Sequence, residues 1–242
     1  YVRDQKGKDK FGYDDNKINL TYSNQEPDKY ALQARFSPNY MYYHADGEEN
    51  VNYKADNHES TRNGTSKSRQ HVFTPVADVY FWKQLPNAQE LAINVVGTVF
   101  NTSNKYTNKE FDSQGALALN DDMNEQNRKY SLIAEANYSK KHDFGKLNFG
   151  YTFEGNRMNS VIENSFDDTD YRTSYVNNYA YGEFSGQKNN WMYMASIGLS
   201  YRVRHSYQQQ LKDWIFRPRA MVGYTIDKRN SLRLVFERSN TE

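Results

Sequence analysis

The alternation of hydrophobic and polar positions is clearest between Trp191 and Arg204. One alternate set contains Trp191, Tyr193, Ala195, Ile197, Leu199, Tyr201 and Val203, and the other contains Met192, Met194, Ser196, Gly198, Ser200, Arg202 and Arg204. A period of two places the two sets on opposite faces of a β-strand. An average strand has about five or six residues, whereas a membrane-crossing strand needs roughly nine to eleven, with aromatic residues at both interfaces. We therefore predict a transmembrane β-strand here.

The same alternation recurs along the chain in pairs of segments joined by compact turns. The pairs are residues 11–23 with 29–43, 70–83 with 89–101, 127–140 with 146–156, 175–185 with 191–204, and 214–226 with 231–239. In the segment 175–185, Asn177 and Asn178 interrupt the pattern, so its two faces stay ambiguous. These segments predict an all-β fold: an antiparallel transmembrane β-barrel with about ten strands, in five hairpins, in this chain.

Polar segments without apolar periodicity separate the hairpins. They span residues 44–68, 102–126 and 157–171, with a shorter one at 205–210, and we expect them to be loops. Short turns would then alternate with long loops, as in outer-membrane barrels, where the turns are periplasmic and the loops extracellular. Pro75 and Pro218 fall inside predicted strands, which indicates an edge or a bulge at each.

Composition excludes several other classes of protein. The chain has 242 residues and is 37% hydrophobic, but it holds no run of about eighteen apolar residues, so a helical membrane protein is excluded. The 21 Tyr and 13 Phe are too many for a disordered chain. A net charge of +1 gives no general attraction to nucleic acid. The absence of cysteine removes disulfides, thiolate metal sites and cysteine catalysis.

The two faces of the predicted strands assign two groups of residues. We expect the apolar face to contact lipid or form aromatic girdles through Tyr30, Phe81, Tyr138, Phe149, Trp191, Tyr193, Ile197, Leu199, Tyr201 and Tyr224. A charged side chain facing lipid costs roughly 2–4 kcal/mol near the midplane, so charged residues on the other face should point into the lumen. These lumen-facing candidates are Arg35, Asp78, Glu135, Glu154, Arg202, Arg204, Arg217, Arg219, Arg233 and Glu237.

Few residues suggest specific chemistry. Arg202, Arg204, Arg217 and Arg219 come from two neighbouring predicted strands, near the loop end that these strands share, and would attract an anionic group or pair with acidic neighbours. The acidic residues Glu48, Glu49, Asp121, Asp122, Asp167, Asp168 and Asp170 lack calcium-loop spacing, and we expect them to be solvated. The five His are scattered. We predict no catalytic residues, metal or cofactor.

Two stretches resemble a known family. Residues 179–186 read Tyr-Ala-Tyr-Gly-Glu-Phe-Ser-Gly and residues 194–201 read Met-Ala-Ser-Ile-Gly-Leu-Ser-Tyr, and residues 216–219 and 230–238 form a second pair. Both resemble hairpins of TonB-dependent receptors that carry the outer-membrane-protein β-barrel domain. Ser200 stands where that family often has Arg, and Arg217 is an insertion between Phe216 and Pro218.

The resemblance implies a barrel of about 22 strands that holds an N-terminal plug. Because the chain begins at Tyr1 and ends directly after an alternating run, we expect residues 1–242 to be a barrel segment that lacks the plug and the remaining strands.

The function implied is import of a scarce nutrient (a siderophore, vitamin, peptide or glycan) across the bacterial outer membrane. The implied partners are TonB, a surface lipoprotein, and the lipid and lipopolysaccharide of the membrane. Two alternatives stay open: an accessory barrel in an envelope complex, and a small omptin-like protease barrel with His44 or His205 at its rim.

Overall fold

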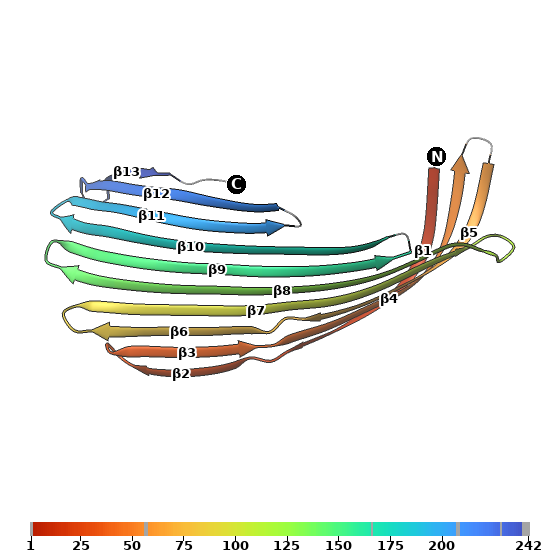
Figure 1. Cartoon of the computed structure of the whole chain (residues 1–242), viewed down its shortest axis with the longest axis horizontal. Helices are drawn as coiled ribbons and strands as arrows, with labels where there is room; N and C mark the ends of the chain where they lie inside the picture. The colour runs from red at the N-terminus through yellow and green to blue at the C-terminus, as the bar shows by residue number, and fades with distance from the viewer. Residues whose placement is uncertain (1, 56–57, 166, 207–208, 228, 239–242) are drawn as a thin grey trace.

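The computed structural model describes residues 2–55, 58–165, 167–206, 209–227 and 229–238, and it contains one antiparallel sheet of 13 strands (Figure 1). The strands are β1 (Val2–Lys17), β2 (Leu20–Glu26), β3 (Tyr30–Ser37), β4 (Asn39–Ala55), β5 (His58–Phe73), β6 (Val76–Leu85), β7 (Gln89–Phe111), β8 (Leu117–His142), β9 (Gly145–Asn164), β10 (Asp168–Lys188), β11 (Trp191–Ser206), β12 (Gln209–Thr225) and β13 (Ser231–Glu237). Among the residues described, no helix is long and apolar enough to cross a membrane.

These strands form ten continuous ribbons, as the alternation predicts. The three extra strands arise because β1 and β2, β3 and β4, and β5 and β6 are each one ribbon with a short interruption. The interruptions, at residues 18–19, Pro38 and 74–75, lie beside one another and stay hydrogen-bonded through Ile18 N to Pro38 O (3.1 Å) and Thr74 N to Asn39 O (2.8 Å). Proline has no amide proton, so Pro38 and Pro75 account for two of the three breaks.

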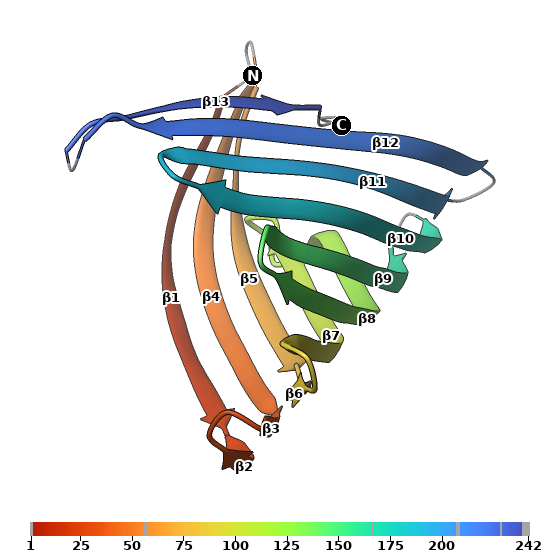
Figure 2. The ribbon, with the colours of Figure 1, turned by 90° about the vertical axis from the view of Figure 1, so that its left-hand side faces the viewer.

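The sheet is open and strongly curved. Sequential ribbons are neighbours throughout, and the two outermost strands, β2 and β13, are exposed along their whole length. Figure 2 shows the sheet curving round from β2 and β3, through β8 and β9, to β12 and β13. The chain therefore forms a curved wall with two free edges.

Register divides the side chains into two faces that run unbroken across the sheet. Paired residues of an antiparallel ladder lie on the same face, so the pairs Trp191 with Tyr224 and Tyr138 with Phe149 extend one face from strand to strand. On the opposite face lie nine residues other than glycine that are at most 9% exposed: Val51, Thr102, Glu110, Ser139, Ser160, Asn177, Ser200, Arg202 and Ile215. Side chains crowd where a curved sheet is concave, so we call this the inner face and its reverse the outer face.

The outer face carries an apolar band bordered by aromatic pairs. On β11 and β12, Trp191 packs against Tyr224 at 4.8 Å between ring centroids, and Tyr201 packs against Trp214 at 4.6 Å. Ten residues separate Trp191 from Tyr201, which is about 33 Å along a strand at about 3.3 Å per residue. A tilt of about 40° reduces this to about 25 Å, the height of the apolar band of an outer-membrane barrel.

Most of the described residues in the long polar segments predicted as loops are strands instead. Residues 44–55 and 58–68 continue β4 and β5, 102–111 and 117–126 continue β7 and β8, and 157–164 and 168–171 continue β9 and β10. Both faces of these extensions are polar, so the apolar alternation that marks a strand is missing although the backbone still pairs. The ribbons therefore project well beyond the apolar band at one side only, while tight turns close the other.

The two prolines in predicted strands occupy positions where a missing donor costs little. Pro75 lies in the gap between β5 and β6, and its carbonyl accepts Val99 N at 3.1 Å. Pro218 lies inside β12, and its carbonyl accepts Arg238 N (3.2 Å) just past the end of β13. In an antiparallel sheet, the N–H and the C=O of one residue point to the same neighbouring strand. An N–H at position 218 would therefore point toward β13 just past its last residue, where the β12–β13 pairing ends, so its absence leaves no ladder hydrogen bond unmade.

The inner face as candidate functional site

Register places all ten lumen-facing candidates on the inner face and all ten lipid-facing candidates on the outer face. The sequence leaves the two faces of residues 175–185 ambiguous, and the register assigns them. Asn177 lies on the inner face and is 9% exposed, whereas Asn178 lies on the outer face. There the Oδ1 atom of Asn178 accepts a hydrogen bond from the Tyr151 hydroxyl at 2.7 Å. That the inner face meets water and the outer face lipid stays a prediction at this point.

Two tyrosines of β10 form the centre of the inner face. The Tyr181 ring lies across Gly150 of β9, where a Cβ would come within 2.0 Å of it, and its hydroxyl donates to Asn137 Oδ1 on β8 at 2.9 Å. The Tyr179 ring covers Gly198 of β11 and stacks on Tyr181 at 5.5 Å. The two glycines thus make room for a flat aromatic strip that crosses strands β8 to β11.

A guanidinium group extends this strip to β12. The Cζ of Arg217 lies 5.2 Å from the centroid of the Tyr179 ring, within the range of a cation–π contact. No periodicity in the sequence indicates this strip, because the strip depends on glycines in other strands at matching register. Aromatic rings beside a guanidinium group can bind a flat or anionic ligand by stacking and charge.

The four arginines predicted as one group are separated in the structure. Arg202 and Arg204 lie near the projecting end of β11, opposite Asp213 and Leu211, whereas Arg217 and Arg219 lie at mid-height on β12, opposite Gly198 and Ser196. The expectation that all four share the loop end is therefore wrong. Because β12 runs antiparallel to β11, the residues that face Arg202 and Arg204 lie near the start of β12, and Arg217 and Arg219 come later in that strand. Arg219 pairs with Glu237 on β13, Nε to Oε2, at 3.7 Å.

Other inner-face charges are also paired across strands. Arg35 Nη2 lies 3.4 Å from Asp78 Oδ2, and Asn148 Nδ2 donates to Glu183 Oε1 at 3.1 Å. Near the turn end, Glu90 Oε2 accepts Ser139 Oγ at 3.1 Å and lies 3.5 Å from Lys146 Nζ. These contacts form a polar network along the inner wall.

A buried carboxylate holds the projecting ribbons together. Glu110 on β7 is 1% exposed, accepts Tyr53 Oη at 2.9 and 2.8 Å, and accepts Arg62 Nη1 at 3.0 Å. The Arg62 guanidinium also lies 4.7 Å from the centroid of the Tyr53 ring. The three side chains come from β4, β5 and β7, within segments that the sequence analysis assigned to loops, so no periodic signal indicated the cluster.

The acidic pairs do not form a cation site among the described residues, and no group of three His, Asp or Glu residues there could hold a metal. Asp122 is exposed on the outer face of a projecting ribbon. Hydrogen bonds from the side chains of Thr107 and Asn120 lower the pKa of Asp122 below its ordinary 3.8, which keeps the carboxylate charged in water.

The histidines considered for a protease do not converge. His44 lies on β4 and His205 on β11, both on the outer face by register. Six strand spacings of about 4.8 Å separate the two strands, roughly 29 Å along the sheet. His44 and its neighbour His71 instead stack with Tyr42, at 5.5 and 4.7 Å between ring centroids. Tyr40 Oη lies 2.8 Å from His71 Nδ1, so these rings form an aromatic patch just beyond the apolar band.

Known structures share this fold. The chain superposes on the unliganded ferric citrate transporter FecA with a TM-score of 0.54 and 10% identity, covering 93% of this chain and 42% of that one. It also superposes on the ferripyoverdine receptor of the outer membrane of Pseudomonas aeruginosa bound to ferripyoverdine, with a TM-score of 0.51 and 5% identity, covering 93% of this chain and 40% of that one.

No protein-family model and no curated protein matches the sequence. The chain thus has the fold of a segment of a TonB-dependent receptor barrel, as the resemblance implies, and spans about two fifths of the length of the structures it matches.

Proposed function

We propose that this chain belongs to the wall of a TonB-dependent transporter barrel in the bacterial outer membrane. The transporter would import a scarce nutrient such as a siderophore, vitamin, peptide or glycan fragment. The observation that carries the proposal is the sorting of ten ribbons into an apolar outer face and a polar inner face across the whole sheet. The shared fold with FecA and the ferripyoverdine receptor supports the same assignment.

The outer face fits a bilayer. Its apolar band has the height of a hydrocarbon core, and the aromatic pairs Trp191–Tyr224 and Tyr201–Trp214 lie at the two borders, where amphipathic rings are favoured. An open sheet edge is not stable in hydrocarbon because its backbone groups lack partners. We therefore propose that further strands pair with β2 and β13 and close a barrel of roughly 22 strands around a plug.

The inner face fits a water-filled lumen. Glu135 and Glu154 lie there near the aromatic strip of Tyr179 and Tyr181, Arg233 lies farther along the same face on β13, and the polar network keeps the wall hydrated. We propose that these side chains line the path of the nutrient and contact the plug. The projecting ribbons would lie outside the cell and the tight turns in the periplasm, with TonB acting from the periplasmic side and a surface lipoprotein from the other.

A deletion experiment tests the transport function. The gene is deleted, and growth is measured on a panel of iron–siderophore, vitamin, peptide and glycan sources, each supplied at limiting concentration. We expect a growth defect on one source, restored by the wild-type gene and reproduced by loss of TonB without any further defect in the double deletion. Normal growth on all sources, together with co-purification of the protein in a stable envelope complex, would instead support an accessory barrel.

A further inference from the structure

A shallow groove crosses the outer face where the apolar band ends. Its floor is a register row, which is a line of residues that pair with one another across neighbouring strands. This row runs through Phe36, Ala77, Gly97, Leu132, Gly155 and Val176 on six consecutive ribbons. Small residues in this row leave a hollow of about 610 Å³, lined almost entirely by carbon atoms. At Gly97 an added Cβ would meet nothing within 4 Å, so open space lies directly above this residue, whereas the Phe153 ring lies over Gly155.

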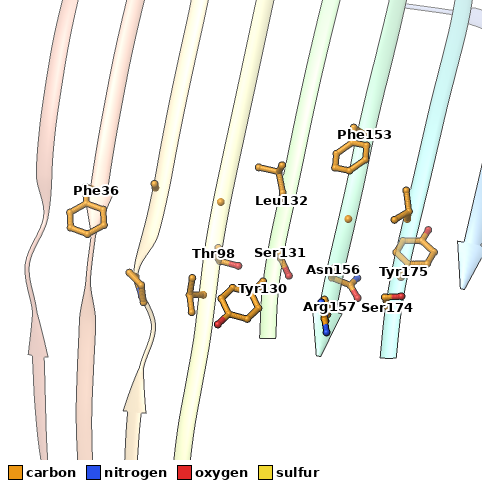
Figure 3. Close-up of a pocket in the computed structure, with 16 residues that line it drawn as sticks. Phe36, Thr98, Tyr130, Ser131, Leu132, Phe153, Asn156, Arg157, Ser174 and Tyr175 are labelled. Carbon is orange, nitrogen blue, oxygen red and sulfur yellow. The ribbon is translucent and has the colours of Figure 1, made fainter. Parts of the chain in front are cut away.

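One border of the groove is cationic. The next register row toward the projecting side holds Val99, Tyr130, Arg157 and Ser174, and Figure 3 shows the last three along the same border of the groove. Arg128 lies one row farther out on β8, diagonal to Arg157 on β9, which is a separation of about 7–8 Å between backbones. Both arginines are exposed, and no described acidic side chain forms an ion pair with either.

The acidic side chains nearest to these two arginines on the outer face either bind another residue or lie several register rows away. Asp170 binds Arg172 at 2.9 Å, and Glu163 accepts Asn124 Nδ2 at 3.0 Å three register rows beyond Arg157. Arg172 on β10 lies in the same register row as Arg128 but binds Asp170, so Arg128 and Arg157 are the described positive charges nearest to the groove that no described acidic side chain pairs with. Two guanidinium groups at this spacing suit one phosphate, because each offers a planar pair of donors.

We propose that this groove binds the phosphorylated end of a lipopolysaccharide molecule, with an acyl chain of its lipid A moiety in the hollow and a phosphate between Arg128 and Arg157. The arginines lie on the projecting side of the hollow, so the charges and the apolar groove follow one another outward in the order that such a lipid requires. The assignment rests on the proposed function, because it needs the projecting side to be the lipopolysaccharide side of an outer membrane.

The test uses the intact protein, purified from outer membranes in mild detergent, and counts retained lipopolysaccharide by native mass spectrometry. We expect one molecule to remain on the wild-type protein and its occupancy to fall at least about tenfold in the double variant Arg128→Gln, Arg157→Gln. The matched control is Lys129→Gln, which removes the same charge from the adjacent residue on the inner face and should retain the lipid. Equal retention by the double variant would overturn the proposal.

A second pair of variants tests the hollow without changing charge. Gly97→Leu should fill the groove and lower the occupancy by a similar factor, whereas Ala136→Leu, on the outer face but outside the groove, should not. Cold gel electrophoresis, which separates folded from unfolded barrels, shows that each variant is folded before it is compared. Full occupancy in folded Gly97→Leu protein would also overturn the proposal.

The lipid itself is identified by adding it back to delipidated protein. Lipid A with its phosphates should rebind, and dephosphorylated lipid A should not; rebinding of phosphatidylglycerol as tightly as of lipid A would overturn the choice of lipopolysaccharide. A protein that reaches the outer membrane and supports nutrient uptake but retains no lipid defeats only this inference. A protein absent from outer-membrane fractions defeats the proposed function.

Discussion

At the scale of single residues, glycines decide where large side chains can lie on the inner face. Tyr179 and Tyr181 lie flat on the wall because Gly198 and Gly150 have no Cβ beneath them. On the outer face, Gly97 leaves an open hollow that no described side chain enters. The same residue type therefore supports packing on one face and leaves space on the other.

The contact between Tyr181 and Gly150 should be sensitive to one methyl group. Gly150→Ala would place a Cβ within 2.0 Å of the Tyr181 ring, push the ring off the wall and break its hydrogen bond to Asn137. We expect a loss of about 1–3 kcal/mol in the free energy of unfolding, the usual cost of overpacking. Urea unfolding in detergent micelles measures the loss, and Gly97→Ala, whose Cβ meets nothing, is the control; equal stability of the two variants would contradict the packing argument.

The turn after β12 should be stabilised in a pH-dependent way. The side chain of Asn230 and the backbone N–H of Arg229 donate to Asp227 and lower its pKa below the ordinary 3.8. A carboxyl group whose pKa is lower in the folded state stabilises that state above its unfolded pKa, and the effect is lost as the pH falls through the folded pKa.

We therefore expect the stability difference between the wild type and Asp227→Ala to be greatest near neutral pH and to shrink as the pH falls below 3.8. Unfolding in urea at a series of pH values measures it. Asp227→Asn keeps an acceptor oxygen without the charge, so its difference from Asp227→Ala should not vary with pH. A constant difference between wild type and Asp227→Ala would contradict the role given to the charge.

At the scale of the elements, each ribbon has two regions with different surroundings. The turn-side region has an apolar face and a polar face, whereas both faces of the projecting region are polar. The change occurs close to the aligned breaks at residues 18–19, Pro38 and 74–75 in the first three ribbons. The breaks therefore mark the level at which the ribbons leave the apolar band.

A charge placed in the middle of the band distinguishes the two faces. Ile197 lies midway between Trp191 and Tyr201 on the outer face and is 64% exposed, and the adjacent Ser196 is on the inner face. Ile197→Lys should lower the stability in a bilayer by about 2–4 kcal/mol, because a midplane lysine faces hydrocarbon. Ser196→Lys should have a much smaller effect, since Ser196 lies beside Glu183 on the inner face, which we propose lines a water-filled lumen. Equal costs, measured by urea titration of protein refolded in vesicles, would argue against a lipid-facing outer surface.

At the scale of the whole molecule, the asymmetry between the two rims gives the wall a direction. All described turns at one rim are short, and the ribbons at the other rim extend as paired strands that are polar on both faces and are held by Glu110, Tyr53 and Arg62. Paired polar strands keep a fixed shape, unlike long unstructured loops. They therefore offer a defined surface at the mouth of the proposed barrel.

The direction can be measured with thiol labelling because the chain has no native cysteine. Thr61→Cys places a thiol on the projecting region of β5, and Asp143→Cys places one in the turn between β8 and β9. On intact cells we expect a membrane-impermeant maleimide to label the Thr61→Cys variant and to label the Asp143→Cys variant only after lysis. The reverse pattern would contradict the proposed orientation.

The sequence alone determined the number of ribbons and the two faces. A period of two is a local property of the chain, so residues such as Trp191, Ile197 and Arg202 could be assigned to faces without any knowledge of their neighbours, and register agrees in each case. The Tyr179 and Tyr181 strip, the groove over Gly97 and Gly155, and the separation of Arg202 from Arg219 were decided only by tertiary structure, because each depends on which residues of different strands share a register row. The projecting strands could not be predicted from the sequence either, since a ribbon with two polar faces needs backbone pairing but shows no apolar alternation.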